Sequence, residues 1–142
     1  MSKTLTVGKA GEYRVASELL LRGYKVYLDA IGDTAVDLVL DNGRKIQVKA
    51  AHRISAYDKR HPEYTQYNFS FKSWNKESGH YLTHPLKGIS HIILWAIDDD
   101  IFFILPSKEV RGKFGVRFGL GKRRSWSQYA HFKNNWDCLR VK

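Results

Sequence analysis

The chain has little cysteine, no long apolar run and no signal-peptide pattern, and each of these absences argues against a class of protein. Its single cysteine, Cys138, excludes an internal disulfide framework, fits a reducing cytosol and makes a structural zinc site improbable, so we expect a small buried apolar side chain. No run of about 18 apolar residues is present to span a membrane, and no basic amphipathic helix is long enough to bind its surface. The first 15 residues lack the apolar core of a signal peptide. We therefore expect a cytoplasmic protein without a membrane partner.

Acidic residues are also scarce relative to basic ones. The 142 residues include 24 Lys and Arg against 14 Asp and Glu, which gives a net charge of +10 and a pI near 9.8. Such a balance favours a polyanionic partner, and nucleic acid is the first candidate. A hydrophobic content of 43% and the absence of a visible internal boundary predict one globular domain over residues 1–142.

Metal motifs built on histidine are absent. His80 and His84 are four residues apart, but Gly79 and Pro85 argue against a helix there, and no His-Glu-x-x-His signature occurs. Three consecutive aspartates at 98–100 lie between two apolar runs, where a solvated turn explains them better than a metal site does.

A short hairpin at residues 35–51 holds the most informative polar side chains. We expect strands at 36–40 and 45–50, joined by a turn in which Asn42 and Gly43 supply positive φ angles.

Three polar residues interrupt the apolar pattern of this hairpin: Asp37 on the first strand, and Gln47 and Lys49 on the second. Because side chains alternate along a strand, Gln47 and Lys49 share one face while Ile46 and Val48 take the other. A carboxylate, an amide oxygen and an ammonium group then converge, as a metal site that hydrolyses phosphate esters requires. The hairpin alone leaves a plainer alternative open, with Asp37 as a turn former and Lys49 in solvent.

A helix is predicted before the hairpin, over residues 8–22. Val15 and Leu19 mark its apolar stripe and Gly23 its end, and a strand at 24–28 follows. Glu12 lies in the expected first turn, on the edge of the stripe. The helix macrodipole by itself favours a carboxylate there, so Glu12 has a structural as well as a catalytic explanation.

The ordered set formed by this helix, strand and hairpin resembles the core of the PD-(D/E)XK nuclease superfamily. The resemblance covers residues 8–51 and rests on Glu12, Asp37, Gln47 and Lys49 standing in the order of the family's active-site residues. It implies an α/β fold with a restriction-endonuclease-like core, a mixed central β-sheet flanked by helices. It also implies an endonuclease that hydrolyses DNA phosphodiester bonds with these four residues as its catalytic set.

The same resemblance implies a bound metal ion. Asp37, the Gln47 oxygen, the main-chain carbonyl of Val48 and Glu12 would hold Mg²⁺, and we expect Mn²⁺ to substitute for it. Lys49 would orient or help deprotonate the attacking water. In most members of this superfamily a Glu occupies the place of Gln47. Gln also occurs there in group I intron homing endonucleases that resemble this core.

The second half of the chain gives weaker signals. We expect a loop at 52–66 beside the nucleic acid, a strand at 67–71 and a polar stretch at 72–88. Two buried strands are expected at 91–97 and 101–106, with Ser107 capping a short helical turn.

A run of basic residues follows at 111–124. It fails the Walker A pattern, because Gly121-Lys122 is followed by Arg and position 116 is not Gly. We interpret it as a flexible flap that meets phosphates, with Phe114 and Phe118 holding it to the body, and a solvated loop is the alternative. The residues expected to contact DNA are Lys9, Arg53, Lys113, Arg117, Lys122, Arg123 and Arg124.

An aromatic segment at 125–142 completes the chain. It predicts a helix that packs Trp126, Tyr129, Trp136 and Leu139 on the sheet, and base stacking by one of the aromatics is the alternative.

Three functions are compatible with these observations. The first is an endonuclease acting on branched DNA, similar to Holliday junction resolvases. The second is a sequence-specific homing or restriction endonuclease, and the third a DNA-binding module that does not cleave. Small size without a separate recognition domain favours the first, so we expect cleavage of a four-way junction, although duplex DNA stays open.

Assembly and location follow from this expectation. Cutting two strands needs two sites, which predicts a homodimer or a dimer of dimers, with 91–97, 101–105 and the aromatic segment as candidate interfaces. We expect a cytoplasmic protein, and a nucleoid-associated location or a viral or mobile-element origin fits the same function.

Overall fold

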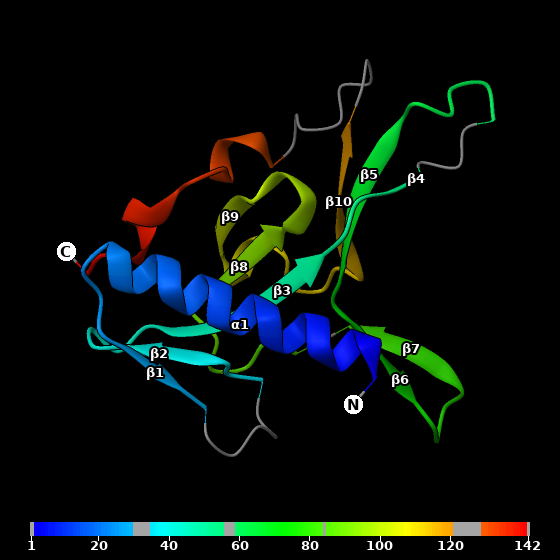
Figure 1. The fold of residues 1–142 in the computed structure, drawn as a ribbon. Coiled ribbons are helices and arrows are strands. Elements are labelled where there is room, and N and C mark those ends of the chain that lie inside the picture. Colours follow the sequence, from blue (N-terminus) through cyan, green and yellow to red (C-terminus); the bar gives the residue numbers. More distant parts are fainter. Residues whose placement is uncertain (1, 30–34, 56–58, 84, 121–128, 142) are drawn as a thin grey trace.

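A computed structural model describes residues 2–29, 35–55, 59–83, 85–120 and 129–141. One α-helix and a five-stranded mixed sheet form the centre of the structure, as Figure 1 shows. The sheet has the order β1-β2-β3-β8-β9, in which β3 and β8 are parallel and all other neighbours antiparallel. The predicted α/β fold with a mixed central sheet is confirmed.

The elements have the following bounds. The central unit comprises α1 (Lys3–Leu21), β1 (Val26–Leu28), β2 (Leu38–Leu40), β3 (Lys45–Ala51), β8 (His91–Ala96) and β9 (Ile101–Pro106). A second sheet has the order β10-β5-β4, from Gly115–Leu120, Thr65–Ser70 and Ile54–Ser55, and a separate hairpin pairs β6 (Lys72–Asn75) with β7 (His80–Thr83). Four 3₁₀ turns are η1 (Ile97–Asp99), η2 (Ser107–Glu109), η3 (Ala130–Phe132) and η4 (Trp136–Leu139).

Helix α1 begins five residues earlier than the sequence pattern predicted. Ser2 is its N-cap, and the Ser2 Oγ accepts a hydrogen bond from the Leu5 N–H at 3.3 Å. Glu12 therefore lies in the middle of the helix, and the macrodipole explanation for its position is wrong. The helix ends near the predicted place, and Gly23 follows with a φ of +95°.

The predicted hairpin is present with a shorter first strand. Asp37 lies directly before β2, but its N–H donates to the Ile46 carbonyl at 2.9 Å, so it stays aligned with β3. Only Gly43 in the turn has a positive φ, of +88°; Asn42 does not, contrary to the prediction. The Asn42 Oδ1 instead accepts from the Arg44 N–H at 3.1 Å, which fixes the turn through a side chain.

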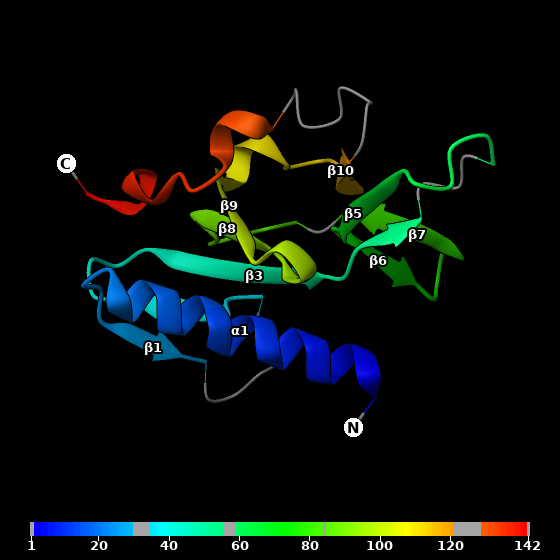
Figure 2. The ribbon, with the colours of Figure 1, turned by 45° about the horizontal axis from the view of Figure 1, so that its top comes forward.

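The central sheet separates two apolar cores, and Figure 2 shows α1 lying along one of its faces. The core on this side joins α1 to β2, β3, β9 and η4 through Val15, Leu19, Leu38, Ile46, Val48, Ile104 and Trp136. On the other side Tyr67, Phe69, Ile92, Phe103, Phe118 and Phe132 pack together. A second sheet covers the face where a flanking helix was expected. Strands β8 and β9 are mostly buried in these cores, so they offer little apolar surface for a dimer.

The basic flap expected at 111–124 is in part a regular strand. Residues 115–120 form β10, which pairs with β5 in six-residue register. Phe118 is fully buried as predicted, whereas Phe114 is 54% exposed and does not anchor the segment. Residues 121–124 lie outside the described part of the chain.

The described part of the C-terminal aromatic segment, residues 129–141, folds as 3₁₀ turns and not as the predicted helix. Tyr129, Trp136 and Leu139 are nevertheless buried, which confirms their assignment to the core, and Trp126 lies outside the described residues. Cys138 is only half-buried. Ser107 lies inside η2 and donates its hydroxyl to the Ile89 carbonyl at 2.7 Å, so it does not cap the turn as predicted.

The aspartates of the turn before β9 are exposed, as expected of a solvated turn, but all three also have partners. Asp100 binds the Arg14 guanidinium of α1 at 2.9 Å and accepts from the Trp95 indole N–H at 2.7 Å. Asp99 binds the Arg53 guanidinium and accepts from the Tyr67 hydroxyl at 2.6 Å. Through these ion pairs and hydrogen bonds the turn links α1 and β5 to the end of the β8–β9 pair.

Asp98 completes the set, since it accepts a hydrogen bond from the Arg53 N–H at 2.9 Å and faces the His52 Nδ1 at 3.1 Å. The segment that leaves β3 is thus held by the same turn.

Helix α1 packs closely against β3 at Gly11. A Cβ atom added at Gly11 would lie 2.8 Å from the Ala50 Cβ, closer than two carbon atoms can pack. The absence of a side chain at Gly11 therefore sets the distance between helix and sheet.

Replacing Gly11 by Ala should lower stability, while the same change at Gly8, in the same helix with open space around it, should raise it. Each change gains about 0.5–1 kcal/mol of helix propensity, but overpacking at Gly11 costs about 1–3 kcal/mol. Urea unfolding followed by circular dichroism measures both. Equal stabilisation by the two variants would show that the helix can move away from β3 without cost.

Candidate active site

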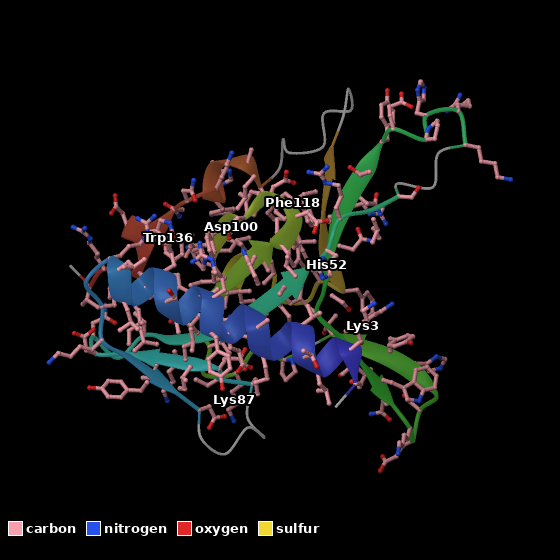
Figure 3. All side chains as sticks on the ribbon, in the orientation of Figure 1. Lys3, His52, Lys87, Asp100, Phe118 and Trp136 are labelled. Carbon is pink, nitrogen blue, oxygen red and sulfur yellow. The ribbon has the colours of Figure 1, made fainter. Side chains whose placement is uncertain are left out.

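A pocket of about 520 Å³ opens between the N-terminal half of α1 and the end of β3. It contains all four residues that the sequence pattern grouped as catalytic: Glu12, Asp37, Gln47 and Lys49. Figure 3 labels Lys3 and His52, two further lining residues, at the end of the molecule where α1 begins and β3 ends. The site is therefore built by a helix and a hairpin that meet through Gly11.

The hairpin positions its polar groups as the alternation of a strand requires. Ile46 and Val48 enter the core beneath α1, and Gln47 and Lys49 alternate with them along β3. The Asp37 Oδ2 accepts a hydrogen bond from the Val48 N–H at 2.8 Å. This bond holds the carboxylate against the main chain of β3, midway between the two polar side chains.

Asp37 is unusual in its electrostatics. Its pKa is raised from 3.8 to about 6, chiefly by burial and then by the charge and hydrogen bond of the Glu12 carboxyl. The Val48 N–H and the Lys49 ammonium oppose this rise. Two carboxyl groups thus share a poorly solvated place, where a bound cation would relieve their repulsion.

Burial also lowers the pKa of Lys49, against the opposing charge of Asp37. The lowered pKa makes the ammonium a better proton donor and, when neutral, a base for water. On the other side of the pocket, Glu12 binds the Lys9 ammonium at 3.0 Å, and this contact raises the pKa of Lys9.

Gln47 gives the most direct indication that the pocket suits a metal ion. Its side chain is only 5% exposed, and within the described part of the protein its Oε1 has no hydrogen-bond partner. A buried amide oxygen without a partner is costly, so such groups call for an explanation. Its place beside Asp37 and Glu12 suits a hard cation, which prefers carboxylate, amide and carbonyl oxygens. Among the described residues no three His, Cys, Asp or Glu side chains are placed to hold a metal ion together, so a cation here would need amide or main-chain oxygens beside the carboxylates.

Three of the described residues predicted to contact DNA pair with other side chains of the protein. Lys9 pairs with Glu12 at the edge of the pocket, and Arg53 is bound to Asp99. The Lys113 ammonium lies 2.7 Å from the Tyr129 hydroxyl, so both Arg53 and Lys113 hold the fold together. Arg117 is exposed on β10. Lys122, Arg123 and Arg124 are outside the described residues.

The sequence interpretation missed part of the pocket wall. Lys3 and Thr4 line it because α1 starts early, and Ser2 as an N-cap was the signal for that start. His52 lines it from the end of β3, with Asp98 against its Nδ1. A neighbouring hollow of about 360 Å³ brings Asp29 close to Glu12 and Asp37.

Asp37→Asn should stabilise the protein at pH 8 in the presence of EDTA. Because the native pKa is raised, the folded state keeps its proton between pH 4 and 6 while the unfolded state loses it, so stability falls across that range and the full cost is present at pH 8. The gain should be about 1–2 kcal/mol after allowance for solvent near this half-buried group, and it should vanish below pH 4. Urea unfolding at pH 4 and pH 8 measures it; a gain that does not change with pH would contradict the raised pKa.

Comparisons with known proteins support the fold and no more. No family model matches the sequence, and no curated protein does so either. None of the described helices is long and apolar enough to cross a membrane. A solved structure of a bacterial homing endonuclease, I-Ssp6803I, matches with a TM-score of 0.76 and 15% sequence identity, over 97% of this chain and 93% of the other. The chain therefore shares the fold of a solved endonuclease.

Proposed function

We propose that the protein is a divalent-metal-dependent DNA endonuclease of the PD-(D/E)XK type, with its active site at Glu12, Asp37, Gln47 and Lys49. The observation that carries the proposal is the buried Gln47 oxygen, which has no hydrogen-bond partner among the residues that the structure describes and lies beside a carboxylate whose pKa is raised. A net charge of +10 suits a nucleic-acid substrate. The fold shared with a homing endonuclease is consistent with the same chemistry.

Each residue has a separate task in this proposal. Four groups would hold the metal ion: Asp37, Gln47, Glu12 and the Val48 carbonyl. The hydrogen bond from the Val48 N–H fixes the direction of the Asp37 carboxylate. A bound Mg²⁺ or Mn²⁺ supplies charge neutralisation at the phosphate and lowers the pKa of a coordinated water. Lys49 orients the attacking water and offsets the negative charge that grows on the phosphate. Lys9 pairs with the Glu12 carboxylate at 3.0 Å and offsets part of its charge.

Two substrates fit this site. The sequence favours a four-way junction, because its basic residues are spread over several predicted loops and suit recognition through shape and phosphates. The structural neighbour is named a homing endonuclease, which favours a specific site in linear duplex. In both cases paired cuts require two pockets, so we propose a homodimer or a dimer of dimers.

Changes at positions 47 and 49 should separate metal binding from cleavage. Gln47→Leu keeps the bulk but removes the oxygen, so Mn²⁺ affinity in calorimetry should fall about tenfold or more and cleavage should be lost. Gln47→Glu adds a charged oxygen and should keep activity or tighten the metal. Lys49→Ala should abolish cleavage and leave DNA binding at low salt intact, because most affinity comes from basic residues elsewhere.

Lys45→Ala is the matched control for Lys49→Ala, since Lys45 lies exposed on the same strand. Full activity and unchanged metal affinity in Gln47→Leu would remove the amide from the site.

A cleavage assay distinguishes the substrates. The sequence-based prediction is that a four-way junction is nicked in pairs near its branch point, whatever the sequence of its arms, and that linear competitor displaces it poorly. An enzyme that reads bases would cut one linear site instead, because each mismatched pair costs about 1–3 kcal/mol. Cutting of a linear site without preference for the junction would replace the junction by the homing or restriction alternative. Cleavage of neither with Mg²⁺ or Mn²⁺ would favour a module that only binds.

A further inference from the structure

The hairpin β6–β7 stands away from both cores with large apolar side chains in solvent. Trp74 is 55% exposed, Tyr81 51% and Leu82 45%, and none of its residues belongs to either core. In Figures 1 and 2 it projects from the end of the molecule where α1 begins. An isolated two-stranded hairpin is marginally stable in water, so a surface of this kind calls for a partner.

One face of the hairpin combines aromatic rings with a cation. Trp74 lies directly opposite Tyr81 in the register, and their rings contact edge to face at 5.0 Å. The Lys72 ammonium lies 4.5 Å above the Tyr81 ring. These contacts hold rings and charge in one arrangement before any partner binds.

A groove of about 420 Å³ lies at the base of the hairpin. Its walls include Lys72 from β6, Asn68 from β5 and Arg117 from β10, together with the exposed ring of Phe114. The Phe71 N–H donates to the Phe114 carbonyl at 2.8 Å, which joins the start of the hairpin to the strand that enters β10. The hairpin face and the groove therefore form one surface.

The second sheet continues this surface with groups that can read bases. Asn68 pairs with Arg117 in the register of β5 and β10, and both side chains are exposed. On the opposite face Phe69 and Phe118 are buried, so the exposed face is polar by the alternation of the strands. The Gln66 amide donates to the Asn68 Oδ1 at 3.1 Å, which orients the Asn68 side chain. Amide and guanidinium groups are the side chains that read adenine and guanine edges.

The positive charge of this surface favours DNA over a second copy of the protein as its partner. Between Glu63 and Asp98 the sequence has one acidic residue, Glu77, against three lysines. A symmetric contact through this surface would bring the Lys72 and Arg117 charges of one copy near those of the other, without carboxylates in the groove to balance them. Phosphates supply the missing negative charge.

We propose that one surface, the reading surface, binds double-stranded DNA outside the cleavage pocket, with the hairpin in a groove of the DNA. This surface consists of Asn68, Lys72, Trp74, Tyr81, Phe114 and Arg117. A two-stranded ribbon fits the major groove. Lys72 contacts phosphate, Arg117 and Asn68 contact base edges, and Trp74 and Tyr81 pack against bases or sugars. This inference rests on the proposed function for its substrate class, and it favours duplex over junction as the substrate.

The test measures DNA binding in EDTA, so that no cleavage is needed. The probe is a fluorescein-labelled linear duplex pool of random sequence, followed by anisotropy at several salt concentrations. Trp74→Ala with Tyr81→Ala should weaken binding about 5- to 150-fold. Lys72→Ala with Arg117→Ala should flatten the salt dependence by about 1–2 in its logarithmic slope.

The matched control is Lys25→Ala with Tyr27→Ala, which removes an exposed cation and an exposed aromatic from the region of β1. The control should bind like the unchanged protein, and all variants should keep its melting temperature. Selection of bound duplexes from the pool should lose base preference at one or more positions with Arg117→Ala alone.

Two results overturn the inference. One is binding by the hairpin variants that equals the control. The other is loss of self-association in sedimentation with no change in the affinity of each protomer for DNA, which would assign the surface to a second copy. Failure of the proposed function gives a distinct result. A protein that binds DNA through this surface but does not cleave it with Mg²⁺ or Mn²⁺ would contradict the proposed function and agree with this inference.

Discussion

The parallel pairing of β3 with β8 is the constraint on which the rest of the structure depends. Parallel neighbours cannot be joined by a tight turn, so the chain needs a long crossover between them. Here the crossover runs from His52 to Ser90 and contains β4 to β7. It covers the second face of the central sheet with β5 and places the β6–β7 hairpin outside. One topological requirement thus creates both the second core and the exposed surface.

The candidate site concentrates unfavourable electrostatics where α1 and the β2–β3 hairpin meet. Two carboxyl groups, a lysine and an amide oxygen meet where water has limited access, and the pKa values of Asp37 and Lys49 shift in the directions that burial imposes. The surrounding structure tolerates this because α1 and β3 are held together at Gly11 and by the core beneath the helix. Buried charged groups with shifted pKa values lower stability, and such groups are common at functional sites.

Local patterns predicted the site better than they predicted the molecule around it. The spacing of Asp37, Gln47 and Lys49 follows from strand alternation, which is a local property, so the sequence was sufficient to group them in one place. Glu12 was grouped correctly although the start of its helix was wrong, because helix starts are set by weak caps such as Ser2. Pairing of β10 with β5 joins residues more than 40 positions apart, and no local signal in a basic, glycine-rich segment announces it. Charge alone could not show that Arg53 and Lys113 have partners inside the protein.

The aspartate turn at residues 98–100 joins the helix that carries Glu12 to the sheet that carries Asn68. Arg14 is fastened at Asp100 and Tyr67 at the neighbouring Asp99, so the helix and the second sheet are attached to adjacent residues of the backbone. The two regions are therefore a fixed length apart. If the protein cleaves DNA as proposed, a duplex in contact with both regions would be cut at a constant number of base pairs from the bases that the second sheet contacts.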